Sequence, residues 1–81
     1  MQALLDAIAQ MPLPTDAQRI FHGRGGLHPG CEHWVLDAYP PVLVLTSFLP
    51  ADADTDAQLA TIGAALAQRW EILAPGQPLN W

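Results

Sequence analysis

The chain has no lysine and only one cysteine, and its three arginines are its only basic side chains apart from three histidines. Eight carboxylates outnumber those cations and give a formal net charge of −5 at neutral pH. A net-acidic surface repels phosphate, so we expect this chain alone not to bind nucleic acid non-specifically. A lone cysteine forms no disulfide within the chain, and a cytoplasmic setting is the default expectation.

Long apolar runs are missing as well. The longest, 42–45, is far shorter than the roughly 20 residues that a membrane helix needs, so we expect no membrane partner. The first residues lack the basic flank of a signal peptide. The 81 residues, 51% of them hydrophobic, predict one small globular domain near the lower size limit for a single core.

Apolar spacing predicts the element order α-β-β-β-α-β, which is an α+β fold. We expect a small antiparallel sheet of three to four strands with two helices packed on one face. The domain divides into an N-terminal helix and Pro-rich linker (1–18), a sheet–helix core (19–73) and a tail (74–81). The elements expected within it are helices 2–10 and 55–69 and strands 19–22, 32–39, 42–48 and, at an edge, 71–73.

Strands 32–39 and 42–48 most simply pair as a hairpin, and the more apolar second strand is expected at the centre of the sheet. Thr55 with Gln58 predicts a capping box at the start of the second helix, and Arg69 suits the dipole of its last turn. The predicted core combines the apolar face of each element. Its members are Leu36, Val42, Val44, Leu59, Ile62, Leu66 and Trp70.

The stretch 19–30 holds two of the three arginines, two of the three histidines and four of the six glycines. We expect a short strand, 19–22, that runs into an exposed glycine-rich loop. A nucleotide-binding glycine loop opens a helix, which Pro29 and Gly30 prevent here, and no P-loop motif is present. The chain is therefore expected to bind no cofactor, and the loop is interpreted as a structural hairpin or a recognition loop.

Two chemical alternatives involve the residues around Cys31. Imidazole and thiolate suit zinc, but no paired ligand spacing anchors the set, so no metal is expected. Cys31 with His33 as a base would form a nucleophile pair, yet so small a chain has little room for a cleft, and no catalytic residue is expected. The candidate metal ligands that these arguments weigh are His22, His28, Cys31, Glu32 and His33.

Two segments carry a family resemblance: RIFHGRGGLHPG at 19–30 and VLDAYPPVLVLT at 35–46. Together they resemble the N-terminal region of bacterial class I SAM-dependent methyltransferases of the rRNA cytosine type. That region begins with the pattern R-[IL]-F-H-G-R-G-x-x-[YH]-P-G and continues into a hairpin. The resemblance covers under half of the chain. Cys31 departs from the family pattern, in which a leucine precedes the glutamate.

The resemblance implies an accessory domain that engages RNA on behalf of a downstream methyltransferase domain and is not catalytic by itself. The family's SAM-binding glycine loop has no counterpart in these residues. The implied substrate- or partner-binding residues are Arg19, His22, Arg24 and His28. The alternative is a small protein-interaction or dimerisation module, which binds itself or another protein and has no nucleic-acid role.

Overall fold

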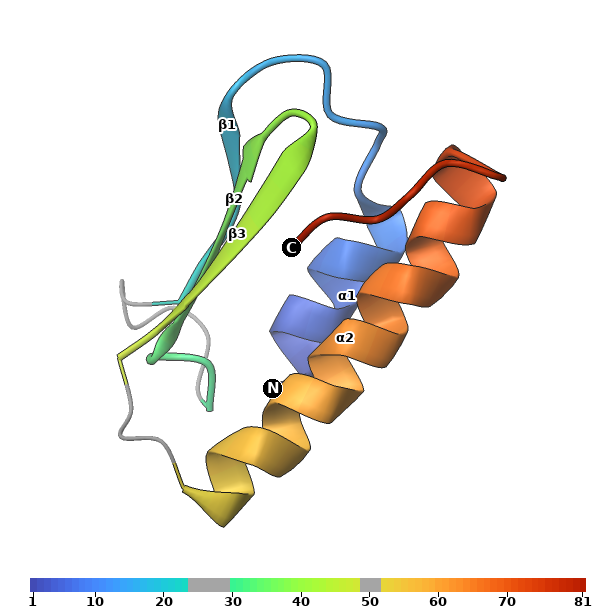
Figure 1. Ribbon diagram of the computed structural model, residues 1–81. Coiled ribbons are helices and arrows are strands. Elements are labelled where there is room, and N and C mark those ends of the chain that lie inside the picture. The colour runs from blue at the N-terminus through green and yellow to red at the C-terminus, as the bar shows by residue number, and fades with distance from the viewer. Residues whose placement is uncertain (24–29, 49–51) are drawn as a thin grey trace.

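The computed structural model describes residues 1–23, 30–48 and 52–81. It has two layers, with helices α1 (Gln2–Gln10) and α2 (Ala53–Leu73) on one face of a single sheet (Figure 1). The sheet is antiparallel, in the order β1 (Gln18–His22), β2 (Trp34–Tyr39), β3 (Val42–Ser47). The predicted α+β fold is thus confirmed, with three strands. Within the described residues, neither helix combines the length and apolar character needed to cross a bilayer.

The central strand is β2, and the expectation that β3 is central was wrong. The β2–β3 hairpin forms as predicted, but β1 pairs with the other side of β2 and leaves β3 at an edge. The predicted edge strand 71–73 was also wrong, because these residues form the last turn of α2. The tail meets β3 instead, where the Leu43 N–H donates to the Asn80 carbonyl at 2.9 Å.

The inner face of the sheet fixes the core. Trp34, Leu36 and Ala38 of β2 are fully buried against the helices. On β3 it is Leu43 that points inward, at 3% exposure. Val42 and Val44, predicted in the core, are 39% and 40% exposed, which corrects that prediction. Strand side chains alternate with period two, and Val42 lies opposite the outward-facing Tyr39, so β3 turns its even-numbered residues outward.

The helices supply the other half of the core as the sequence predicts. Ile62 and Leu66 are fully buried, while Leu59 and Trp70 are partly buried against the same cluster. From α1, the fully buried residues are Leu4 and Ile8. A nine-residue helix is marginal in isolation, so α1 owes its stability to this docking.

Helix α2 begins and ends outside its predicted bounds. Its N-cap is Asp52, whose Oδ1 accepts the Thr55 N–H at 2.8 Å, so the capping box predicted at Thr55 and Gln58 was wrong. Thr55 lies in the first turn of the helix and is buried. Gln58 has a different role: its Oε1 accepts the indole N–H of Trp34 at 3.2 Å and links α2 to the sheet.

Arg69 links the two helices. Its Nε and Nη2 donate to the Met11 carbonyl at 2.9 and 2.7 Å, and Met11 is the C-cap residue of α1. Because α2 continues to Leu73, Arg69 does not lie at the helix end, as the dipole argument assumed. The tail crosses α2 where Trp81 packs on Gly63, and a Cβ there would approach its ring to 2.8 Å.

Candidate interaction face

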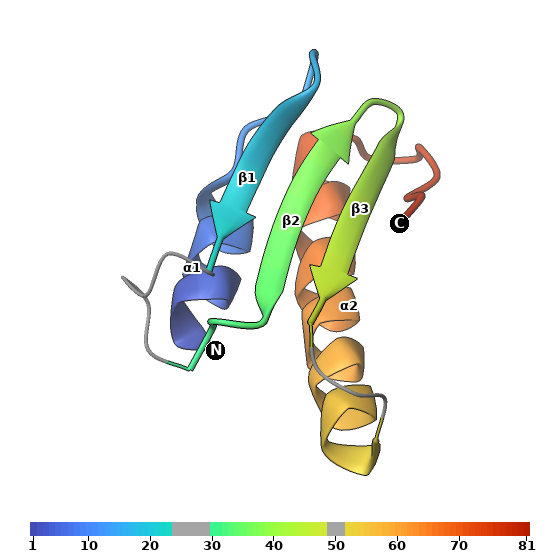
Figure 2. The ribbon, with the colours of Figure 1, turned by 90° about the vertical axis from the view of Figure 1, so that its left-hand side faces the viewer.

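The sheet has an outer face that the helices do not cover (Figure 2). Pleating and register bring alternate side chains of β2 and β3 to this face. On β1 the bulge between Arg19 and Phe21 breaks the alternation, so that Arg19 lies opposite Asp37 and His22 opposite Val35, both on this face. We define the outer face by these residues: Arg19, His22, Val35, Asp37, Tyr39, Val42, Val44 and Thr46. Phe48 continues it beyond β3, since its N–H donates to the His33 carbonyl at 2.9 Å.

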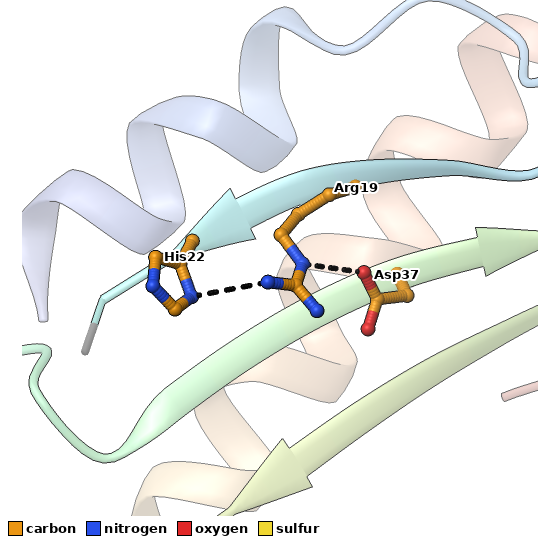
Figure 3. Close-up of polar contacts among 3 residues, drawn as sticks. All are labelled: Arg19, His22 and Asp37. Carbon is orange, nitrogen blue, oxygen red and sulfur yellow. Dashed lines mark hydrogen bonds and ion pairs between the residues drawn. The ribbon is translucent and has the colours of Figure 1, made fainter. Parts of the chain in front are cut away.

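The β1 side of the outer face is polar. Arg19 lies directly opposite Asp37 in the register, and its Nε donates to Asp37 Oδ1 at 2.9 Å (Figure 3). Arg19 Nη1 also lies 3.4 Å from Nδ1 of His22, which is three residues further along the same strand. The hydrogen bond to Asp37 and its negative charge raise the pKa of Arg19 further above its ordinary value. The guanidinium is therefore charged at any physiological pH and already has a carboxylate partner.

The β3 side of the outer face is apolar. Tyr39, Val42, Val44 and Phe48 are 55%, 39%, 40% and 51% exposed. Val35 lies on this face too, yet it is only 4% exposed and stands apart from the core cluster. It is opposite both His22 and Thr46 in the register, so it lies at the centre of the face. The face thus has a buried apolar centre, an apolar side along β3 and a polar side along β1.

An apolar groove begins where the outer face ends at the β2–β3 turn. It has a volume of about 310 Å³ and lies between that turn, the linker after α1 and the C-terminal tail. Its walls carry no charged side chain, and Val42 belongs both to the groove and to the outer face. Trp70 lines the groove, and its indole N–H is buried without a hydrogen-bond partner in the described part of the chain.

Of the four residues implied by the methyltransferase resemblance, the structure brings two together. Arg19 and His22 are neighbours on the outer face, whereas Arg24 and His28 lie outside the described residues. The strand leads into that segment through Gly23, which is buried and donates its N–H to the Trp34 carbonyl at 2.9 Å. A Cβ at Gly23 would overlap the carbonyl of Cys31, so glycine is required where the two chain segments touch.

Among the residues weighed for metal or nucleophile chemistry, His28 lies outside the described residues, and the others form no metal site. In the ranges 1–23, 30–48 and 52–81 there is no cluster of three histidine, cysteine or carboxylate side chains that would hold a metal ion. Cys31 is a free cysteine that is fully buried in the core. Glu32 has a pKa below its ordinary value because its carboxylate accepts its own N–H and that of Gly30, which fixes the turn before β2.

The outer face was not identified from the sequence, although the alternation along β2 already divided that strand's side chains between two faces. The prediction that Val42 and Val44 are buried did not allow for the tight turn at Pro40–Pro41. This turn sets Tyr39 opposite Val42 and so places Val42 and Val44 on the exposed side. Comparison with known proteins finds no matching family model, no similar curated protein and no similar solved structure. The methyltransferase resemblance therefore rests on the two quoted segments alone.

Proposed function

We propose that the chain is a protein-interaction module that docks through the outer face of its sheet. The observation that carries this proposal is the exposure of Tyr39, Val42, Val44 and Phe48 along β3 and its turn from β2. They lie on the face of the sheet that the two helices do not cover (Figure 2). A cluster of large exposed apolar residues next to polar ones is typical of a binding surface on a small protein. Within the described residues, the helix layer covers the opposite face of the sheet (Figure 1), which leaves this side for a partner.

Charge favours a protein partner over a nucleic acid. In the described part of the chain, both arginines are engaged, Arg19 by Asp37 and Arg69 by the Met11 carbonyl. Asp37 is the only carboxylate on the outer face and is neutralised there, so the face is close to neutral overall. Phosphate binding depends on accessible cations, whereas an interface core is depleted of charge.

A role beside RNA is the second candidate, and the contact between Arg19 and His22 favours it. These two residues, implied by the resemblance as substrate-binding, lie together on an exposed surface. We propose, on this alternative, that the chain is the RNA-side accessory domain of a methyltransferase and that Arg19 contacts phosphate. Arg19→Ala should then lower RNA affinity and reduce the salt dependence of binding by about one phosphate contact. Unchanged RNA affinity would exclude this role for Arg19.

The proposed function is tested by the size of the assembly that contains the chain in its own cell extract. An interaction module should elute in gel filtration well above its mass of 8.8 kDa. Val44→Lys places a charge at the centre of the apolar side and should return the chain to its monomeric position, because an interface core does not accept an unpaired charge. Lysine at 44 is tolerated in the monomer, since Val44 is 40% exposed and a lysine there can extend its ammonium group into water.

Ala60→Lys is the matched control, because Ala60 is exposed on α2 on the other side of the molecule. It adds the same charge and should leave the elution position unchanged. If wild type elutes as a monomer, or if Val44→Lys and Ala60→Lys behave alike, the outer face is not the docking surface.

A further inference from the structure

We propose that the open edge of β3 binds an extended peptide segment of another protein, which adds to the sheet as a further strand. This inference goes beyond the proposed function, because it concerns backbone groups at the edge of the sheet and not the side chains of the outer face. The edge of a strand presents a row of N–H and C=O groups that another extended backbone matches, and several kinds of peptide-binding domain use such a row.

The strand pairing shows which backbone groups of β3 point to the edge. The Phe48 N–H donates to the His33 carbonyl at 2.9 Å, and these two residues are opposite each other when the β2–β3 register is continued. In an antiparallel pair, hydrogen-bonded positions alternate with positions whose N–H and C=O point away from the partner strand. Leu45 lies three residues before Phe48 and opposite Leu36, so its N–H and C=O point away from β2.

A contact with the C-terminal tail confirms this direction. Leu43 lies two residues before Leu45, and its N–H donates to the Asn80 carbonyl at 2.9 Å. Asn80 forms a parallel bridge with Val42, beside the start of β3 (Figure 2). The edge thus already accepts one extended residue. Beyond it, in the part of the chain that the structure describes, the N–H and C=O of Leu45 have no hydrogen-bond partner.

The two edges of the sheet differ in how they are protected. Strand β3 (Val42–Ser47) has no charged residue and no proline, and its register with β2 is unbroken. Strand β1 carries the charged Arg19 and a bulge between Arg19 and Phe21. Charges, prolines and bulges are the features with which proteins keep edge strands from pairing further. Their absence from β3 makes this edge the place for an added strand.

The residues along β3 define the chemistry of the peptide. An added strand places alternate side chains on the outer face beside Val44, which is 40% exposed. Neighbouring strands favour β-branched or aromatic residues beside a valine. Proline is excluded opposite Leu45, because it has no N–H to donate to the Leu45 carbonyl. We therefore expect an uncharged segment of about five residues with β-branched or aromatic residues at alternate positions.

Hydrogen exchange measured by NMR tests whether the edge is open. In the isolated chain the Leu45 amide should exchange at least ~10-fold faster than the amides of Val44 and Thr46, which lie at the hydrogen-bonded positions opposite β2. Equal protection at all three positions would mean that the edge is already covered, and would overturn the inference.

Binding is tested with a random peptide library displayed on phage and selected on the immobilised chain. The selected peptides should share the alternating, uncharged pattern, and a synthetic copy of one of them should slow exchange of the Leu45 amide at least ~10-fold. The inference is overturned if no peptide is enriched. It is also overturned if the peptide shifts the signals of the Tyr39 ring and leaves the Leu45 amide unprotected, because the peptide then binds to the outer face.

Chemical synthesis of the chain allows one backbone group to be changed alone. Leu45→leucic acid replaces the amide N–H by an ester oxygen and keeps the side chain. It should weaken binding of the selected peptide ~3- to 10-fold, as the loss of one hydrogen bond does. Ala53→lactic acid is the matched control, because it makes the same change at the exposed first residue of α2, and it should change the affinity by less than about 2-fold. Equal affinities of the two esters would contradict strand addition.

These outcomes are separate from the test of the proposed function, because neither ester changes a side chain of the outer face. If the edge fails its tests while Val44→Lys still releases the chain from its assembly in extract, the interaction proposal holds through the outer face alone. If the Leu45 ester weakens peptide binding while Val44→Lys leaves the assembly unchanged, the edge of β3 is the docking site and the outer face is not.

Discussion

Replacing Arg69 tests how the two helices are held together. Arg69 reaches from α2 to the last carbonyl of α1, and two of its nitrogens donate to Met11 O. Arg69→Met keeps most of the aliphatic stem and removes both donors. The carbonyl of Met11, in a residue only 4% exposed, is then left without these partners at the point where α1 ends. Because α1 is short, loss of this link should loosen the whole helix.

The expected cost follows from the lost hydrogen bonds. An unsatisfied carbonyl at a buried site costs about 1–3 kcal/mol, and two donors that share one acceptor do not count twice. We expect Arg69→Met to lower the free energy of unfolding by about 2 kcal/mol, which for a domain of this size corresponds to about 8–16 °C in Tm. The acceptor is neutral, so this loss should change little between low and high salt.

Thermal and urea unfolding followed by circular dichroism measures the effect. Arg69→Lys, with one nitrogen in place of a fork, should recover about half of the loss. Gln68→Met is the matched control, because Gln68 is the exposed neighbour on the same helix, and it should change stability by less than about 0.5 kcal/mol. If Arg69→Met is as stable as this control, the contact with Met11 does not hold α1 in place.

Three further substitutions test the fold. Leu66→Ala leaves a cavity in the fully buried core and should cost about 2–5 kcal/mol in urea unfolding; normal stability would refute the helix-on-sheet packing. Gly23→Ala should disrupt the contact with the Cys31 backbone and broaden the NMR signals of β1, and an unperturbed spectrum would contradict the close approach. Asp52 has a lowered pKa because its carboxylate accepts the Thr55 N–H, so its stabilisation is present above about pH 4 and lost as the pH falls through that pKa. Asp52→Asn caps without titrating, so its stability should fall less between about pH 5 and pH 2 than that of wild type, and equal slopes would exclude the effect.

The parts of the fold that the sequence predicts are those set by local periodicity. The helix at 2–10 and the strands on either side of Pro40 and Pro41 were predicted because their apolar spacing is unambiguous over each element. The centre of the sheet was predicted wrongly, because β3 is apolar on both faces. That pattern usually marks a strand buried on both sides. Here one apolar face packs on the core and the other is the exposed side of the outer face.

The helix bounds show the limit of local signals. Asp52 and Thr55 are both residue types that favour the N-cap position. In the structure Asp52 is the cap and Thr55 is buried, and that burial depends on how α2 docks on the sheet. The segment 71–73 is short, and its apolar Ile72 and Leu73 suit a strand or a helix end equally. The partners of Arg69 and Arg19 lie 58 and 18 residues away, and no local pattern reveals such contacts. The candidate face follows from register, a pairing between strands that periodicity alone does not fix.

The central claim, that the outer face is a docking surface for protein, is tested most directly by a photo-crosslinking amino acid at position 44 in the living host. The account predicts one covalent adduct of defined mass from Val44→p-benzoylphenylalanine, and none from the same residue placed at Ala60. Mass spectrometry of the adduct identifies the partner protein. An adduct with RNA, or no adduct at position 44 while position 60 gives one, would contradict the account.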